Sequence, residues 1–161
     1  MSASCRHFTK PMPRLSIRRA ESQDAAAIQA LYRELVSSPG VSVLPERVAE
    51  AARDARTALF VAEAEGVVLG TVLVSLCLDV MFRSQPFAVL ENIVVSSACR
   101  ASGIGAALMR EVEHYCLAAQ CSKIMLLSGA GRGEAHRFFE KLGFAGGAKK
   151  GFIKYRRQFG V

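Results

Sequence analysis

Residues 90–109 constrain the fold of this chain more than any other stretch. The β-branched run Ile93-Val94-Val95 predicts a buried strand, and apolar residues at helical spacing begin soon after Gly105. Between the two lie Arg100 and Gly103. A helix N-terminus presents unpaired backbone N–H groups and the positive end of the helix dipole, and glycine lets a phosphate approach them. The order therefore predicts an anion-binding turn, with an ordinary strand-to-helix turn as the simpler alternative.

Two familiar phosphate loops do not fit this stretch. A P-loop ends in Gly-Lys-Ser/Thr, whereas Gly105 is followed here by Ala106-Ala107. A dinucleotide-binding turn needs a third small residue, but Leu108 stands at that position. It also needs an acidic residue about 20 positions later, and residues 118–121 contain none.

The six residues Arg100-Ala101-Ser102-Gly103-Ile104-Gly105 resemble the pyrophosphate loop of the GCN5-related N-acetyltransferases (GNAT). A second block, residues 135–144, resembles the late helix and following strand of that family, with a predicted strand at 123–127 between the two. The resemblance covers roughly residues 15–157. It implies an α/β (α+β) fold with a mixed, mostly antiparallel central sheet flanked by about four helices. It also implies acetyl-CoA as cosubstrate and no metal.

The resemblance also implies which residues bind the cofactor. They come from the strand before the loop, the loop with the helix start, and the late helix: Ile93, Val94, Val95; Arg100, Ala101, Ser102, Gly103, Ile104, Gly105, Ala106; Phe138, Phe139 and Lys141. Lys141 could instead be an ordinary solvated helix charge.

Glu91 is the predicted catalytic base. Asn92 either orients the amine or a water or simply satisfies local backbone groups. An amine with a pKa near 10 is mostly protonated at neutral pH, so acetyl transfer benefits from a base. The family often has a carboxylate on this strand. Strict strand alternation would put Glu91, Ile93 and Val95 on one side and Asn92 and Val94 on the other. The alternative for Glu91 is an edge or surface residue in a salt bridge.

The proton donor to the departing thiolate is not evident. Many family members have Tyr where this chain has Phe139, which has no proton to donate. Tyr155, Ser128, Tyr115 or water remain open as substitutes, although Tyr115 lies at the helical spacing of a core residue. His136 on the late helix is expected to be a surface residue.

A narrower resemblance is to glucosamine-6-phosphate N-acetyltransferases, over residues 90–100 and 121–126. The chain departs from them at Asn92, where they favour Asp, and at Ser122 and Phe139, where they favour Tyr. These departures bear on the sugar substrate and leave the CoA loop unaffected.

The remaining pattern predicts a leader at residues 1–14 and one N-acetyltransferase domain at 15–161. Helices are expected after a cap at Asp24, from Pro45, from the loop to about Ala119, and at residues 134–142 before a left-handed Gly143. Glu65-Gly66 predicts a two-residue hairpin turn. The other strands are expected at residues 15–18, 58–64, 67–78, 87–95 and 152–157.

The composition limits the expected binding partners and cellular compartment. With 21 Lys+Arg against 14 Asp+Glu the net charge is +7, which suits a polyanionic cofactor, RNA or simply a solvated surface. Five cysteines without a Cys-x-x-Cys pair favour a reduced, cytoplasmic protein. No apolar run reaches the roughly 18 residues of a membrane span, so no membrane partner is expected.

The sequence thus predicts an acetyl-CoA-dependent N-acetyltransferase that acts on a small primary amine by direct attack in a ternary complex. Two alternatives remain: acetylation of a protein amine or aminoacyl-tRNA, and a non-catalytic acetyl-CoA-binding module. A homodimer is also left open.

Overall fold

The computed structural model describes residues 14–160 of the chain. These form two compact units, one ending at Leu126 and one beginning at Leu127. The predicted leader, apart from Arg14, lies outside the described residues. The assignment of residues 15–161 to a single domain stays a prediction.

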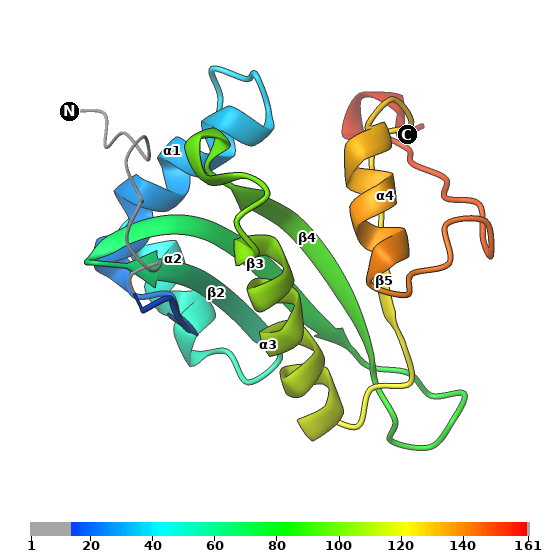
Figure 1. Cartoon of the computed structure of the whole chain (residues 1–161). Coiled ribbons are helices and arrows are strands. Elements are labelled where there is room, and N and C mark those ends of the chain that lie inside the picture. The colour runs from blue at the N-terminus through cyan, green and yellow to red at the C-terminus, as the bar shows by residue number, and fades with distance from the viewer. Residues whose placement is uncertain (1–13, 161) are drawn as a thin grey trace. The chain divides into compact units, whose positions relative to one another are not determined.

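The first unit contains a five-stranded sheet in the order β1-β2-β3-β4-β5 (Figure 1). Its strands are β1 Ser16–Arg19, β2 Thr57–Ala64, β3 Val67–Cys77, β4 Phe87–Val95 and β5 Ile124–Leu126. Neighbouring strands are antiparallel except β4 and β5, which are parallel. The β2–β3 turn is the predicted pair Glu65-Gly66, both with positive φ (51° and 76°), as the tight hairpin turn requires.

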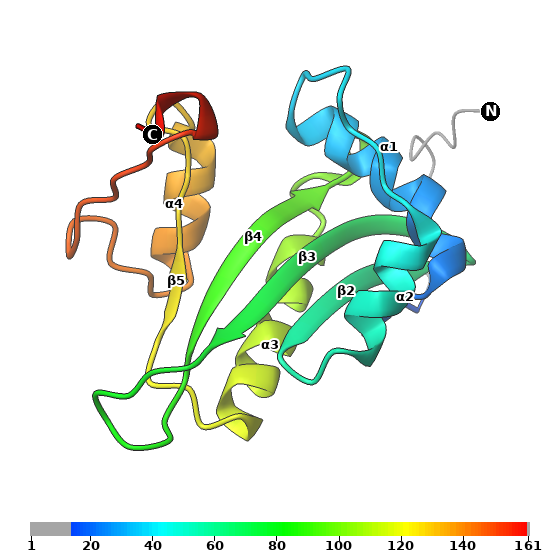
Figure 2. The same ribbon diagram turned by 180° about the vertical axis from the view of Figure 1, so that it is seen from behind.

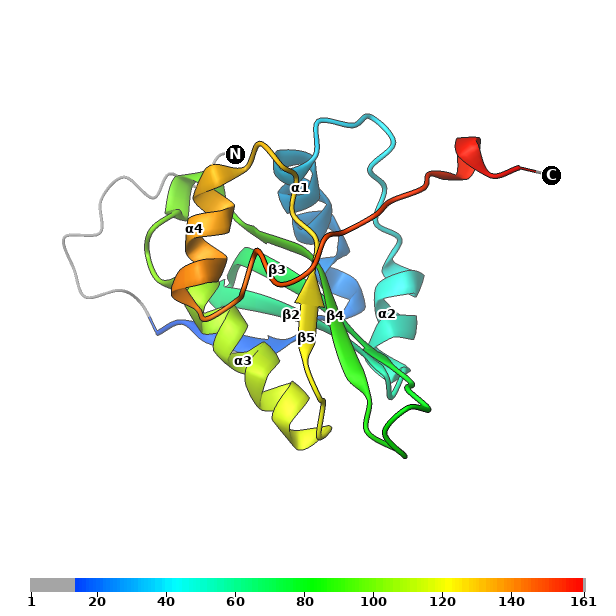
Figure 3. The same ribbon diagram turned by 90° about the vertical axis from the view of Figure 1, so that its right-hand side faces the viewer.

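Helices cover both faces of this sheet. Helices α1 (Ala25–Leu35) and α2 (Pro45–Arg53) lie on one face, and α3 (Ile104–Ala118) lies on the other (Figures 2 and 3). The second unit contains α4 (Gly133–Lys141). The described residues also include three short 3-10 helices: η1 Ser22–Asp24, η2 Ser97–Cys99 and η3 Arg156–Gln158. The predicted fold class, a mostly antiparallel sheet with four helices, is confirmed. No helix in residues 14–160 is long and apolar enough to cross a membrane.

Each face of the sheet buries its own apolar layer. Ile28 of α1 and Val48 of α2 pack with Leu59 and Val61 of β2. On the opposite face α3 approaches closely at Gly70. A Cβ built there would lie 3.1 Å from the Val94 carbonyl oxygen and 3.2 Å from Leu108 Cδ1. Both distances are tight for a Cβ, so glycine at position 70 lets α3 pack closely against β3 and β4.

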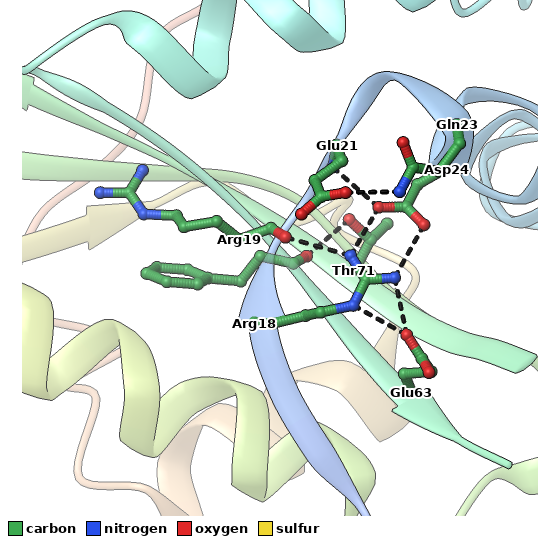
Figure 4. A network of polar contacts seen from close by, with 8 residues as sticks. Arg18, Arg19, Glu21, Gln23, Asp24, Glu63 and Thr71 are labelled. Atoms are coloured by element: carbon green, nitrogen blue, oxygen red, sulfur yellow. Dashed lines mark hydrogen bonds and ion pairs between the residues drawn. The ribbon is translucent and has the colours of Figure 1, made fainter. Parts of the chain in front are cut away.

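A charged network ties β1 and β2 to the start of α1 (Figure 4). The Arg18 guanidinium donates to both carboxylate oxygens of Asp24, at 2.8 and 2.9 Å, and to Oε2 of Glu63 at 2.7 Å. Asp24 Oδ2 also accepts the Glu21 N–H at 2.8 Å. The Asp24 carboxylate therefore binds Arg18 and stabilises the turn before α1. Asp24 is the N-cap residue of α1, as predicted, although its side chain makes no cap hydrogen bond to this helix.

The helix predicted at residues 134–142 is confirmed as α4, which begins and ends one residue earlier. Gly143, which follows it, has the predicted left-handed conformation, with φ 89°. The strand predicted at 152–157 is wrong, because this segment contains only coil and the start of η3. Its residues are exposed, Phe152 by 85%. A strand is stable only when its backbone N–H and C=O groups pair with a neighbouring strand. A local pattern of residue types does not provide that neighbour.

Candidate functional site

The middle of β4 contains a β-bulge at Asn92. Glu91 pairs with Leu73 of β3, and Val94 pairs with Thr71, so the single residue Val72 stands against two residues of β4. Asn92 takes up the extra length with a left-handed φ of 54°. Asn is among the few residues other than glycine that adopt this conformation readily. The sequence pattern gave no direct sign of the bulge.

The bulge changes which side chains share a face. Residues paired directly across two strands lie on one face, and Leu73 and Thr71 of β3 share theirs. Glu91 and Val94 therefore lie on the same side of the sheet. The predicted strict alternation, which separated them, is wrong, because the additional residue reverses the order of the side chains beyond Asn92.

Glu91 shares its face with a pocket under α1 and α2. The pocket has a volume of about 420 Å³, and Leu73, the partner of Glu91 in the sheet, lines it together with Tyr32 and Asn92. Glu91 is exposed, and the pairing of β4 with β5 ends at Leu90, so Glu91 has a strand partner only on the β3 side. Within residues 14–160 the structure gives Glu91 no ion pair. The salt-bridge alternative thus finds no support in the described residues.

Tyr32 of α1 stands beside Asn92 at this pocket. Burial raises the pKa of the Tyr32 phenol, and an interaction with the Asn92 side chain partly opposes that rise. The phenol therefore keeps its proton at neutral pH and can donate a hydrogen bond.

The predicted phosphate loop joins β4 to α3 with an open backbone. Ala101 and Gly103 have positive φ, 61° and 84°, and residues 100–103 are exposed. A Cβ built on Gly103 would meet no heavy atom within 4 Å, so the space beside this turn is free. Ile104, only 1% exposed, anchors the helix start in the core. Gly105, the second glycine of the predicted loop, lies inside the first turn of α3.

The first turn of α3 offers unpaired donors. The Ala107 N–H donates to the Gly103 carbonyl at 3.0 Å, and the N–H groups of Ile104, Gly105 and Ala106 precede it. Such groups have no acceptor within a helix, and they sit at its positive end. Together with the open turn and Arg100 beside it, this arrangement fits an anionic group such as a pyrophosphate.

Glu34 is a residue that the sequence analysis missed. Its carboxylate accepts the Ser97 N–H at 2.7 Å, which ties α1 to the segment between β4 and α3. The two residues are 63 positions apart. An exposed Glu on an amphipathic helix carries no sign of such a partner, so only the structure identifies it.

The predicted site residues of the second unit have these surroundings. Phe139 is 8% exposed and makes edge-on ring contacts with Phe138 and Phe144, at centroid distances of 5.3 and 5.8 Å. Lys141 is exposed. The ring Nε2 of His136 lies 3.0 Å from the Gly129 carbonyl oxygen, a contact in which the ring donates. The roles of Phe138, Phe139 and Lys141 with the cofactor stay predictions.

The suggested proton donors differ in their surroundings. Ser128 Oγ is buried without a hydrogen-bond partner in the described structure, whereas Tyr155 is 55% exposed. Tyr115 packs edge-on against Phe60, and its hydroxyl lies 3.5 Å from the Ala55 carbonyl oxygen, so Tyr115 has a structural role.

Burial raises the pKa of the Cys116 thiol to about 12, which keeps Cys116 from forming a thiolate at neutral pH.

No group of three or more His, Cys, Asp or Glu side chains in residues 14–160 is arranged to hold a metal ion.

Comparison with known proteins places this geometry in context. The acetyltransferase (GNAT) family model matches residues 26–144. A candidate acetyltransferase of Agrobacterium tumefaciens has 26% identity and a TM-score of 0.78, over 87% of this chain and 99% of its own. No curated protein matches the sequence significantly.

Two further solved structures share the fold at lower identity. Glucosamine-6-phosphate N-acetyltransferase of Arabidopsis thaliana has 22% identity and a TM-score of 0.76, over 89% of this chain and 99% of its own. An aminoglycoside N-acetyltransferase in complex with CoA has 20% identity and a TM-score of 0.77, over 93% and 99%.

Proposed function

Since the chain belongs to the acetyltransferase (GNAT) family, and is therefore an acyltransferase that uses acetyl-CoA, we propose that it acetylates a small primary amine by direct attack in a ternary complex. The acceptor class, the attack and the residue roles below are parts of this proposal.

The observation that carries the proposal is the position of Glu91 on β4. Pairing with Leu73 puts the Glu91 side chain on the face of the pocket, and the same strand leads into the open turn before α3. One strand thus connects a base for an amine with a site for a pyrophosphate. Holding both substrates in fixed positions removes much of the entropic barrier to a bimolecular reaction.

Each group then has a defined task. Arg100 and the N–H groups of Gly105 and Ala106 hold the cofactor phosphates. Acetyl-CoA supplies the acetyl group as a thioester. Glu91, directly or through a water, takes a proton from the ammonium, and Asn92 orients the resulting amine. One N–C bond forms, one C–S bond breaks, and the CoA thiolate leaves with the bonding electron pair.

The thiolate requires little help because a thiol has a pKa of only about 8.5. Ser128, with its unpartnered hydroxyl, Tyr155 or water can provide the proton that Phe139 lacks. Restoring a phenol with Phe139→Tyr should keep the fold and CoA affinity and give a modest rise in kcat.

The decisive variant is Glu91→Gln, assayed by acetyl-CoA-dependent release of free thiol. We expect kcat to fall by roughly 10²- to 10⁴-fold, the usual share of general base catalysis, with CoA affinity unchanged. The deficit should shrink at raised pH, where more amine is already neutral. Glu113→Gln, at an exposed position of α3, is the control. A near-normal rate for Glu91→Gln at neutral pH would refute the role of Glu91.

The phosphate site is tested separately with Gly105→Glu. A carboxylate there would fill the helix start and repel phosphate, so calorimetry should detect no CoA binding by the folded variant. Gly146→Glu, in an exposed turn of the second unit, is the control. Unchanged CoA affinity in folded Gly105→Glu would rule out this loop.

A further inference from the structure

We infer that the acetyl acceptor is a primary amine on an apolar body, such as an alkylamine or arylalkylamine, and that it occupies the pocket under α1 and α2. The inference rests on the proposed function and narrows its substrate class.

The floor of the pocket is apolar. Ile28 and Val48 come from the two helices, and Leu59 and Leu73 come from the sheet. Three of these side chains belong to the buried core layer of this face and Leu73 packs against it, so the floor is held in place by the fold. A volume of about 420 Å³ lies within the range of pockets for small organic molecules. Such a floor stabilises a hydrocarbon by removing it from water.

The charged residues of the lining already have partners. The Arg47 guanidinium forms an ion pair with Glu50 on the same helix. The Asp54 carboxylate accepts the Arg56 N–H at 2.9 Å and the Thr57 hydroxyl at 2.8 Å. Among the described lining residues, one cation therefore stands against two carboxylates.

This balance disfavours a sugar phosphate. A phosphate needs cations to pair with, and the described lining offers Arg47 against the carboxylates of Glu50 and Asp54. The hydroxyl groups of a hexose would lose their hydrogen bonds to water over the apolar floor. An alkylammonium meets neither obstacle, since the net negative lining attracts its charge.

The polar end of the pocket fixes the orientation of the acceptor. Asn92 and Tyr32 lie there, and Glu91 shares the same face beside Leu73. An amine directed toward Asn92 and Glu91 would leave its apolar body to run along Leu73 toward Leu59 and Val48. The reacting nitrogen would then lie next to Glu91, the proposed general base. The hydrocarbon would lie against the apolar floor of the pocket.

A panel of acceptors tests the class with the full-length protein. Hexylamine and phenethylamine should have kcat/KM values at least about tenfold above those of propylamine, because each buried methylene contributes about 0.8 kcal/mol. They should exceed glucosamine 6-phosphate and spermidine by a similar or larger factor. Preferred turnover of the sugar phosphate or the polyamine would overturn the inference and leave the acetyltransferase proposal intact.

Two matched variants test the pocket. Ala51 lines it, whereas Ala52, the next residue on α2, is exposed and does not. Ala51→Leu should raise KM for hexylamine roughly tenfold, the scale of overpacking by a few methylenes, with CoA affinity unchanged. Ala52→Leu should leave both unchanged. Equal KM values for the two folded variants would exclude the pocket as the acceptor site.

Direct binding separates this inference from the proposed function. Hexylamine titrated calorimetrically into protein saturated with CoA should bind, and Ala51→Leu should weaken that binding while Ala52→Leu does not. If no amine is acetylated but this pattern holds, the proposed function fails and the ligand class stands. If hexylamine does not bind, the inference is wrong.

Discussion

At the scale of single residues, Asn92 has the largest effect on the candidate site. Its left-handed backbone, with φ 54°, takes up the extra residue of the β-bulge that directly follows Glu91. An L-residue with a branched Cβ cannot adopt this conformation without strain. Asn at this position therefore permits the bulge next to the predicted base.

Replacing Asn92 by Val should destabilise the protein by about 1–2 kcal/mol, the cost of a left-handed conformation for an L-residue. Asn92→Gly is the matched control, because glycine accepts this φ and also lacks the Asn amide. Urea unfolding measures both free energies. If the Val variant proved as stable as the Gly variant, the left-handed conformation would carry no cost and the argument for Asn would fail.

Asp24 illustrates how one buried carboxylate makes stability depend on pH. The hydrogen bond from Arg18 is the main cause that holds the pKa of Asp24 below its usual range, against burial, which raises it. Its contribution is thus fully present above the unfolded pKa of about 3.9 and is lost as pH falls through the lower folded value.

Asp24→Asn should lower the free energy of unfolding at neutral pH by about 1.5–3 kcal/mol, the range for hydrogen bonds to charged groups. The difference from wild type should narrow below pH about 4, as the wild-type carboxylate takes up its proton. Urea unfolding between pH 7 and pH 2.5, with Glu113→Gln as control, measures this. A difference that stays constant over the whole range would contradict the assigned role of the Asp24 charge.

At the scale of elements, α1 serves both halves of the candidate site. It contributes Ile28 and Tyr32 to the pocket, and Glu34 to the hydrogen bond with Ser97 at the start of the phosphate loop. A displacement of α1 would therefore affect the proposed acceptor pocket and the predicted phosphate loop together.

Glu34→Ala should weaken CoA binding by about threefold to tenfold, the share of one hydrogen bond worth about 1 kcal/mol. Glu34→Gln, which keeps an acceptor oxygen, should restore most of the affinity. Arg33→Ala, at the neighbouring exposed position, controls for changes to the helix. Calorimetry gives the affinities, and equal losses in the Ala and Gln variants would show that the bond to Ser97 does not position the loop.

At the scale of the whole molecule, the division into two compact units bears on whether the chain unfolds cooperatively. The second unit, residues 127–160, has one α-helix of nine residues and no strand of its own. So small a unit buries too little apolar surface to be stable alone. We therefore expect the chain to unfold in a single transition.

Differential scanning calorimetry of the full-length protein tests this expectation. A calorimetric enthalpy equal to the van't Hoff enthalpy would indicate one cooperative domain over residues 15–161. Two resolved transitions would contradict the prediction of a single domain.

The sequence by itself determined the elements and their order. The pattern of apolar residues predicted all five strands of the sheet and all four helices, because side-chain direction follows local backbone geometry. The turn at Glu65-Gly66 and the open loop from Arg100 to Gly105 were also predictable, since glycine and its neighbours decide such conformations locally.

Only the tertiary structure decided how these elements make a site. The face of Glu91 depends on how β4 pairs with β3, the pocket needs side chains from two helices and three strands, and Glu34 meets Ser97 across 63 residues. The strand predicted at 152–157 failed for the same reason. A local pattern specifies which conformation a segment prefers, but pairing, burial and long-range hydrogen bonds depend on partners that the segment does not contain.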